Sequence, residues 1–238
     1  MQALDLTLPS AAENLALDEA LLDEAEAALA PDETLRLWEP HTPMVVVGRS
    51  SRIDVEVHVD ACRELGIPVL RRPSGGAAVV AGPGCLMYSL VLSYKLRPHL
   101  RAVSAAHRCI LDAMATALAP FVPGVRPCGT SDLAIGELKF SGNSARSRRE
   151  HLLYHGTLLY DFPLWLIDRC LAMPPRMPAY RGDRPHGRFV TNLPLPAATI
   201  RQALLAAWDV RQHRAHWPEQ RTASLVAEKY SRPEWNGV

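Results

Sequence analysis

The chain of 238 residues lacks the signatures of several large classes of protein. It contains no G-x-G-x-x-G segment and no G-x-x-x-x-G-K-[ST] segment, so the fingerprints of Rossmann and P-loop nucleotide sites are missing. Its net charge of only +1 supplies no broad electrostatic field for nucleic acid. We therefore expect neither of these two nucleotide-binding folds and no nucleic-acid partner.

Cysteine is scarce, because the chain has five cysteines, an odd number, and no C-x-x-C segment. Residues 1–8 lack the basic start and apolar run of a secretory leader, which together with the cysteines predicts the reducing cytoplasm. The longest uncharged run, residues 73–94, is long enough to suggest a membrane span. Its central Gly-Pro-Gly at 82–84 favours two strands and a turn, so we expect no membrane segment.

Length and patterning predict one domain over residues 1–238, without repeats or a linker. The helix expected first along the chain carries acidic residues on one face, which predicts that this face is exposed to solvent. Apolar periodicity predicts helices at 11–30, 54–65, 103–118, 164–171, 197–209 and 224–230. Apolar runs bounded by turn residues predict strands at 35–38, 44–48, 67–70, 86–94, 133–135, 138–140 and 152–162.

The stretch from 128 to 160 carries the strongest site pattern and begins with a hairpin. Gly136 and Glu137 form a glycine-first loop of two residues, which suits a type II′ turn. This register places Lys139 opposite Ala134 and diagonal to Asp132, within reach of a long side chain. One face of the hairpin then carries Asp132, Ala134, Lys139 and Ser141, and the other carries Leu133, Ile135, Leu138 and Phe140.

The small neighbours of Lys139 leave room for its ammonium to point at a ligand, with a solvated surface lysine as the alternative. Ser141 and Gly142 open a run of small, hydrogen-bonding residues directly after it. We therefore predict a ligand site on this face. The next strand adds a polar patch that interrupts its apolar ladder: His155, Gly156 and Thr157.

A second polar segment, at residues 71–76, suits an anion. Arg71 and Arg72 stand directly before it, and an arginine can bind phosphate or carboxylate through two hydrogen bonds. Gly75 and Gly76 let backbone amides approach a ligand closely, although an ordinary turn is the alternative.

The Pro-rich, basic loop at 172–188 carries Arg181, Arg184 and Arg188. A loop of this composition predicts either a mobile lid or a contact for an acidic partner, and a solvated connector is the plain alternative. The arginine cluster at 146–149 lacks interleaved aromatic residues, so we interpret it as a further contact for an acidic carrier rather than for nucleic acid.

Six short blocks occur in a fixed order between residues 14 and 236. They are N-L-A-L-D-E-A-L-L at 14–22, V-G-R at 47–49, R-R-P-S-G-G at 71–76, D-L to K-F-S-G at 132–142, H-G-T-L-L at 155–159 and E-W-N at 234–236. Together they resemble the lipoate-protein ligase A and octanoyltransferase family, which shares its fold with biotin protein ligase. The resemblance implies an α+β fold: a central, mostly antiparallel sheet flanked by helices, expected on one side, of the class II synthetase-like type.

The resemblance implies an enzyme that places a lipoyl or octanoyl group on a lysine of a small acidic carrier of the glycine-cleavage H or dehydrogenase E2 type. Lys139 matches the family's invariant lysine, which contacts the acyl carbonyl and the adenylate phosphate. Many bacterial ligases continue into an accessory domain beyond this point, so a separate accessory subunit is one expectation and a reaction without it the other. The other matching positions, expected to bind substrate or nucleotide, are Arg71, Arg72, Ser74, Gly75, Gly76, Ala77, Asp132, Ser141, Gly142, His155, Gly156 and Thr157.

Two chemistries fit this resemblance. A ligase would activate lipoate or octanoate with ATP and Mg²⁺ to an acyl-adenylate, which requires no protein nucleophile. A transferase would instead use Cys128 as a thioester nucleophile, with its thiol pKa lowered by Lys139 and Arg126; an inert loop cysteine is the alternative. We favour the ligase because R-R-P-S-G-G and H-G-T-L-L are closest to the ligase pattern.

Two weaker interpretations stay open. Residues 77–85 depart from the third Gly and the His-Asp of the ligases, which leaves a non-catalytic protein that binds an acyl group or a carrier. His151 and His155 share a strand face, but no third ligand is evident, so no metal site in the protein is predicted.

Overall fold

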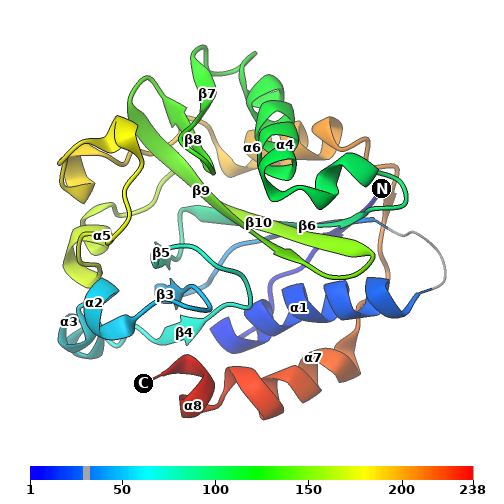
Figure 1. Ribbon diagram of the computed structural model, residues 1–238, viewed down its shortest axis with the longest axis horizontal. Coiled ribbons are helices and arrows are strands. Elements are labelled where there is room, and N and C mark those ends of the chain that lie inside the picture. Colours follow the sequence, from blue (N-terminus) through cyan, green and yellow to red (C-terminus); the bar gives the residue numbers. More distant parts are fainter. Residues whose placement is uncertain (29–32, 238) are drawn as a thin grey trace.

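The computed structural model describes residues 1–28 and 33–237, and its largest element is an eight-stranded sheet (Figure 1). β1 runs parallel to both of its neighbours, and the other neighbouring pairs are antiparallel, so the expected α+β fold with a mostly antiparallel sheet is confirmed. The strand order is β11 (Gln212–His213), β1 (Gln2–Asp5), β2 (Thr34–Trp38), β6 (Cys85–Ser93), β10 (His151–Leu159), β9 (Leu138–Ser147), β8 (Asp132–Ile135) and β7 (Val125–Cys128).

Helices cover both faces of this sheet, so the expectation of helices on one side is wrong. α4 (Val103–Leu118) and α6 (Ala197–Ala207) lie on one face, and α1 (Ala11–Ala27) with its neighbour α7 (Glu219–Leu225) lies on the other (Figure 1). Along β6, Leu90 and Leu92 pack into the core under α4, whereas Val91 packs into the core under α1. Because both faces of the central strands are apolar, both need a cover.

A smaller, three-stranded sheet lies beside the main one. In it β3 (Met44–Val47) runs parallel to β4 (Val69–Arg71) and antiparallel to β5 (Val79–Ala81). The predicted helix at 54–65 is wrong, since the chain forms two short helices, α2 (Ile53–Glu56) and α3 (Val59–Glu64). Val57 lies between these two short helices and forms a β-bridge with Leu171, the residue directly after α5 (Trp165–Cys170). This bridge interrupts the predicted helix.

Helix α1 begins with a capping box, in which the Glu13 amide donates to Ser10 Oγ and the Ser10 amide donates to the Glu13 carboxylate. It ends at Ala27, and residues 29 and 30 of the predicted helix lie outside the described residues. The expected solvent-exposed acidic face is wrong, because Asp18 and Glu19 are both buried. Buried carboxylates need partners, and these two anchor the polar networks described below.

The hairpin of β8 and β9 has the predicted register, with Ala134 opposite Lys139. Gly136 has a φ of +56°, as a type II′ turn requires at its first central position. A bulge between Leu133 and Ala134 shifts the pairing farther from the turn, and Leu138 is left 39% exposed instead of in the core.

The last part of the chain returns to the small sheet. A π-helical turn, η4 (Val226–Tyr230), continues α7, and α8 (Pro233–Asn236) then reaches β4. Single 3₁₀ turns lie at η1 (Pro98–Arg101), η2 (Ala179–Arg181) and η3 (His186–Arg188). Within residues 1–28 and 33–237, no helix has both the length and the apolar character needed to cross a membrane.

Candidate active site

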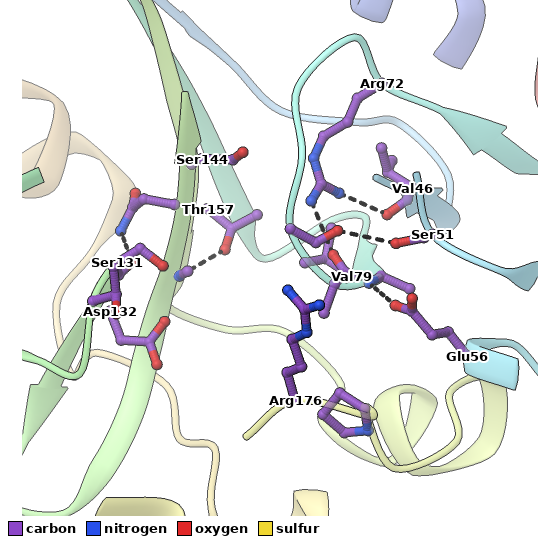
Figure 2. Close-up of a pocket in the computed structure, with 18 of the residues that line it drawn as sticks. Val46, Ser51, Glu56, Arg72, Val79, Ser131, Asp132, Ser144, Thr157 and Arg176 are labelled. Atoms are coloured by element: carbon purple, nitrogen blue, oxygen red, sulfur yellow. Dashed lines mark hydrogen bonds between the residues drawn. The ribbon is translucent and has the colours of Figure 1, made fainter. Parts of the chain in front are cut away.

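A cavity of about 780 Å³ lies between the main sheet and the small sheet. Part of the basic loop forms a third wall, from which Arg176 projects into the cavity (Figure 2). The cavity therefore collects residues from segments that are far apart in the sequence. One of the facing walls in Figure 2 carries Ser131, Asp132, Ser144 and Thr157, and the other carries Val46, Ser51, Glu56, Arg72 and Val79.

Lys139 lines this cavity and forms an ion pair with Asp132, whose Oδ1 lies 2.8 Å from the lysine Nζ. The lysine side chain is 28% exposed and the carboxylate 8%, so the pair sits at the cavity wall and not on the open surface. Tyr180 of the basic loop donates its hydroxyl to the other carboxylate oxygen at 2.9 Å. The predicted diagonal placement of Lys139 and Asp132 is confirmed.

A smaller, mainly apolar cavity of about 110 Å³ opens from the same place. It shares ten lining residues with the larger cavity, Lys139 among them, so the two cavities adjoin. We call the smaller cavity the tunnel. It is lined beyond the shared residues by Val80, Phe140, Ser141, Leu159, Ile167, Leu171, Ala172, His186 and Val190. Among these residues Ser141 was the one expected from the sequence. The others come together only when strands, α5 and the basic loop pack in the folded chain.

Arg72 lines the larger cavity, but its guanidinium is occupied by the loop that follows it. It donates to the carbonyls of Val46, Gly75 and Ala77, at 3.0, 2.6 and 2.9 Å, and to Ser74 Oγ at 3.1 Å. Burial lowers the pKa of Arg72 to about 10, partly offset by attraction to the Glu56 carboxylate. The expectation of an open guanidinium fork for an anion is therefore wrong for this residue: Arg72 shapes the loop from within.

Arg71 does not line the cavity, which corrects its expected role in binding substrate or nucleotide. Its guanidinium donates to backbone carbonyls of residues 48–51 and of the C-terminal helix α8. The backbone of Gly76 and Ala77 does line the cavity, as expected, whereas Ser74 is buried behind it.

His155 connects the glycine loop to helix α1. Its Nε2 lies 2.5 Å from Ser74 Oγ, and its Nδ1 lies 3.7 Å from the carboxylate of Asp18. Burial alone would raise the pKa of Asp18, but Arg36 and the His155 hydrogen bond hold it below its usual value. Asp18 lines the cavity and was not assigned a role from the sequence. The sequence feature that could have identified it is an acidic residue within an apolar, buried helix face.

The basic loop covers the cavity with its first half. Residues 174–178 and Arg181 line it. Of the three arginines expected in a lid, Arg181 reaches the cavity and Arg184 and Arg188 do not, and the lid itself stays a prediction. Arg184 donates instead to three carbonyls of neighbouring residues, and Arg188 is exposed. Arg176, expected within this loop but not singled out as a site residue, and Met177 also line the cavity, because arginine spacing alone does not show which side of a loop faces inward.

Cys128 is 5% exposed and lines neither cavity. Burial raises the pKa of its thiol, and the partly opposing attraction of Arg126 does not reverse this. Arg126 is itself paired with Glu137 at 2.6 Å. The expected lowering of the thiol pKa is therefore wrong.

Two further expectations concern charged clusters. Arg146 and Arg148 form ion pairs with Glu19 and Asp23 within the chain, so they are not open contacts for a carrier. His151 lies 3.2 Å from Glu26, and no group of three or more His, Cys, Asp or Glu residues suited to a metal occurs in the described part of the chain.

The fold and the cavities define an α+β domain in which a small apolar tunnel adjoins a larger chamber, with Lys139 lining both. The family described as "Lipoyl protein ligase A/B catalytic domain" matches residues 10–207 of this sequence. The chain therefore belongs to the lipoyl protein ligase A/B catalytic-domain family.

Named relatives and a solved structure agree with this assignment. A putative lipoate-protein ligase A from Aeropyrum pernix is 34% identical over 71% of this chain, which spans 61% of that protein's length. The octanoyltransferase LipM from Symbiobacterium thermophilum is 27% identical, and the match covers 94% of this chain and 93% of the length of LipM. The structure of a bi-partite lipoate protein ligase from Thermoplasma acidophilum has a TM-score of 0.85 at 25% identity, covering 99% of this chain and 95% of its own.

Proposed function

We propose that this chain, as one domain over residues 1–238, catalyses ATP-dependent ligation of lipoate or octanoate to a lysine of a lipoyl-carrier domain. The observation that carries this proposal is the position of Lys139, which lines both the tunnel and the larger chamber and pairs with Asp132 at 2.8 Å. An apolar acyl chain fits the tunnel, its carboxylate reaches Lys139, and the nucleotide fits the chamber beside the glycine loop. The ligase names of several relatives support the same choice.

The reaction proceeds in two displacements. A carboxylate oxygen of the acid attacks the α-phosphorus of ATP, and the bond to pyrophosphate breaks. The amine of the carrier lysine then attacks the acyl carbonyl, AMP leaves with the bonding electrons, and the amine proton passes to solvent. Negative charge grows on the phosphate oxygens in the first step, and on the acyl carbonyl oxygen and the departing AMP in the second, and the fixed ammonium of Lys139 stabilises it.

Mg²⁺ enters in this proposal as part of the substrate, bound to the ATP phosphates. Magnesium usually needs only one or two protein carboxylates beside phosphate and water. In the cavity wall, Glu56 accepts one hydrogen bond, from the Ala78 amide, and is the carboxylate we propose for this purpose, whereas Asp132 already accepts from Lys139 and Tyr180.

The carrier is a lipoyl domain of the dehydrogenase E2 or glycine-cleavage H type, and a separate accessory subunit is a further expectation. The Thermoplasma ligase is described with its E2 lipoyl domain and as bi-partite, which supports both. With Arg146 and Arg148 paired internally, the exposed Arg176 and Arg188 beside the cavity become the expected contacts for an acidic carrier. Charge reversal at both should raise the KM for the carrier, and an unchanged KM would contradict the contact. Cytoplasmic location stays a prediction from the free cysteines.

A second candidate is ATP-independent octanoyl transfer through Cys128. The coverage of the LipM relative favours it, because that match spans nearly the whole of both chains. The buried thiol with its raised pKa disfavours it. A third candidate is a non-catalytic protein that binds an acyl group or a carrier. It would be excluded if Lys139→Ala stopped product formation while lipoate still bound.

One experiment separates the candidates. The protein is incubated with lipoate or octanoate, a lipoyl carrier and MgATP, and in parallel with an octanoyl-carrier thioester without ATP, and the carrier mass is measured. Acylation that needs ATP and releases pyrophosphate supports the ligase. Transfer without ATP that is lost in Cys128→Ala would overturn the ligase proposal. If neither mixture gave an acylated carrier, only the non-catalytic binding protein would remain.

A further inference from the structure

Arg71 joins three segments that lie far apart in the sequence. Its Nη1 donates to the carbonyls of Gly48, at 2.7 Å, and Ser51, at 2.9 Å. Its Nε donates to the carbonyl of Trp235 at 2.9 Å. A guanidinium has rigidly placed N–H donors, so carbonyls from two segments bound to it are fixed relative to one another.

The end of the chain returns these hydrogen bonds. The indole N–H of Trp235 donates to the carbonyl of Arg71 at 2.9 Å, and the amide of Arg71 donates to Asn236 Oδ1 at 3.0 Å. The side-chain amide of Asn236 also donates to the carbonyl of Tyr230 at 2.9 Å. We call Trp235 and Asn236 the C-terminal clamp.

The residues held by Arg71 lead directly to the cavity wall. Ser51 Oγ donates to the carbonyl of Gly76 at 3.0 Å, and both residues line the cavity. The amide of Arg49 donates to the carbonyl of Ser74 at 2.8 Å. The clamp is therefore separated from the wall only by Arg71 and one further layer of hydrogen bonds.

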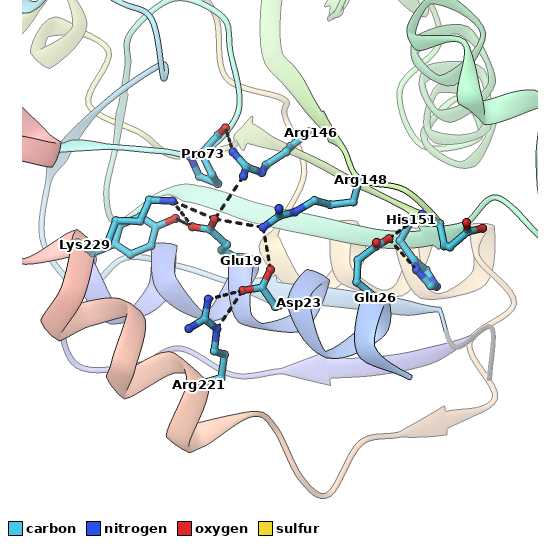
Figure 3. A network of polar contacts seen from close by, with 11 residues as sticks. Glu19, Asp23, Glu26, Pro73, Arg146, Arg148, His151, Arg221 and Lys229 are labelled. Atoms are coloured by element: carbon cyan, nitrogen blue, oxygen red, sulfur yellow. Dashed lines mark hydrogen bonds and ion pairs between the residues drawn. The ribbon is translucent and has the colours of Figure 1, made fainter. Parts of the chain in front are cut away.

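The segment that carries the clamp is anchored on helix α1 (Figure 3). The buried carboxylate of Glu19 accepts from Lys229 Nζ at 2.6 Å and from the Tyr230 hydroxyl at 2.6 Å. Arg146 lies 3.7 Å from the same carboxylate and donates to the carbonyl of Pro73 at 2.8 Å. The C-terminal segment thus reaches the glycine loop by two routes, one through Arg71 and one through Glu19 and Arg146, and the hydrogen bond from Asn236 to Tyr230 connects them.

We infer that the C-terminal clamp is a positioning element, which sets residues 48–51 and 71–76 through Arg71 and thereby shapes the nucleotide end of the cavity. The identity of the ligand as ATP rests on the proposed function. The positioning itself does not, because it is a property of the protein without ligand.

The first test measures positioning directly by hydrogen–deuterium exchange. Trp235→Phe removes the indole donor and reduces the ring that packs on Tyr230 and Lys229, and Asn236→Ala removes both side-chain hydrogen bonds. Trp165→Phe, at an exposed tryptophan of α5, is the matched control. In both clamp variants the peptides covering 48–52 and 71–77 should exchange about fivefold faster, with β6 and β10 unchanged. Asn236→Asp keeps the acceptor for Arg71 and should restore part of the protection.

The second test separates positioning from general loss of stability. The KM for ATP should rise about fivefold in both clamp variants, while the KM for lipoate and kcat stay within about twofold. Unchanged exchange in these peptides, or equal rises in the KM for ATP and for lipoate, would overturn the inference. If the wild-type protein has no ATP-dependent activity, the proposed function fails, and the exchange rates alone still decide whether the clamp positions the loop.

Discussion

Asp18 and Arg36 form an ion pair inside the protein: Nη1 lies 2.6 Å from Oδ1, and the two side chains are 4% and 0% exposed. Ser89 and His155 also contact this carboxylate. An isolated charge at such a depth is costly, so each member of the pair depends on the other.

The first prediction concerns this pair. Asp18→Asn should lower the free energy of unfolding by about 3 kcal/mol, because it leaves the Arg36 guanidinium charged and buried without a counter-charge. Urea unfolding at pH 7 measures the difference. The control is Asp54→Asn, which breaks an exposed pair with Arg52 and should leave stability unchanged. Equal effects of the two substitutions would contradict the prediction.

The second prediction is a dependence of stability on pH. Burial lowers the pKa of His107, which lies beside the Tyr154 hydroxyl at 2.9 Å, and also that of His186. The unfolded chain therefore binds protons that the folded chain does not, so stability is full above about pH 6.5 and falls as the pH drops below it. The slope is at most about 1.4 kcal/mol per pH unit for each histidine.

Urea unfolding of wild type and His107→Gln at pH 7.5, 6.5 and 5.5 measures this slope. The variant should lose less stability than wild type on acidification. Identical slopes for wild type and His107→Gln would show that His107 does not contribute.

The third prediction concerns acyl chain length. Ile167, from α5, lines the tunnel but not the larger cavity. Ile167→Phe should shift preference from octanoate toward hexanoate, and Ile167→Ala toward decanoate, by about fourfold for each methylene. Competition among the three acids measures the preference, and Ile135→Ala, at a residue outside the tunnel, is the control. An unchanged preference in both Ile167 variants would mean that the acyl chain does not occupy the tunnel.

The fourth prediction concerns Cys128. Because burial raises the pKa of this thiol, its alkylation by iodoacetamide at pH 8 should be at least about tenfold slower than that of an exposed thiol. Mass spectrometry of the Cys128 peptide gives the rate, with the half-buried Cys109 as an internal comparison. Faster labelling of Cys128 than of Cys109 would contradict this prediction and would favour the transferase over the ligase.

The sequence predicts those parts of the structure that depend on local geometry. The register that brings Lys139 toward Asp132 follows from a glycine-first turn, and the polar patch at His155 follows from a break in alternation. Neither needs information from a distant part of the chain.

The parts that were wrong depend on distant partners. The acidic face of α1 appears exposed in the sequence because Lys229, the partner of Glu19, lies 210 residues away. Arg71 and Arg72 have the side chains that an anion needs, but carbonyls of other segments occupy Arg71, and Val46 together with the loop's own Gly75 and Ala77 occupies Arg72. The tunnel, likewise, exists only after α5 has packed against the small sheet.

The most direct test of the central claim is the single-turnover formation of lipoyl-adenylate by wild type and Lys139→Met, measured by mass spectrometry beside the Kd for lipoate. We predict that the wild-type protein forms the adenylate, and that the variant forms it at least about a hundredfold more slowly while it still binds lipoate. Adenylate formation at the wild-type rate in Lys139→Met would contradict the role of this ammonium, and no adenylate from the wild-type protein would contradict the ligase itself.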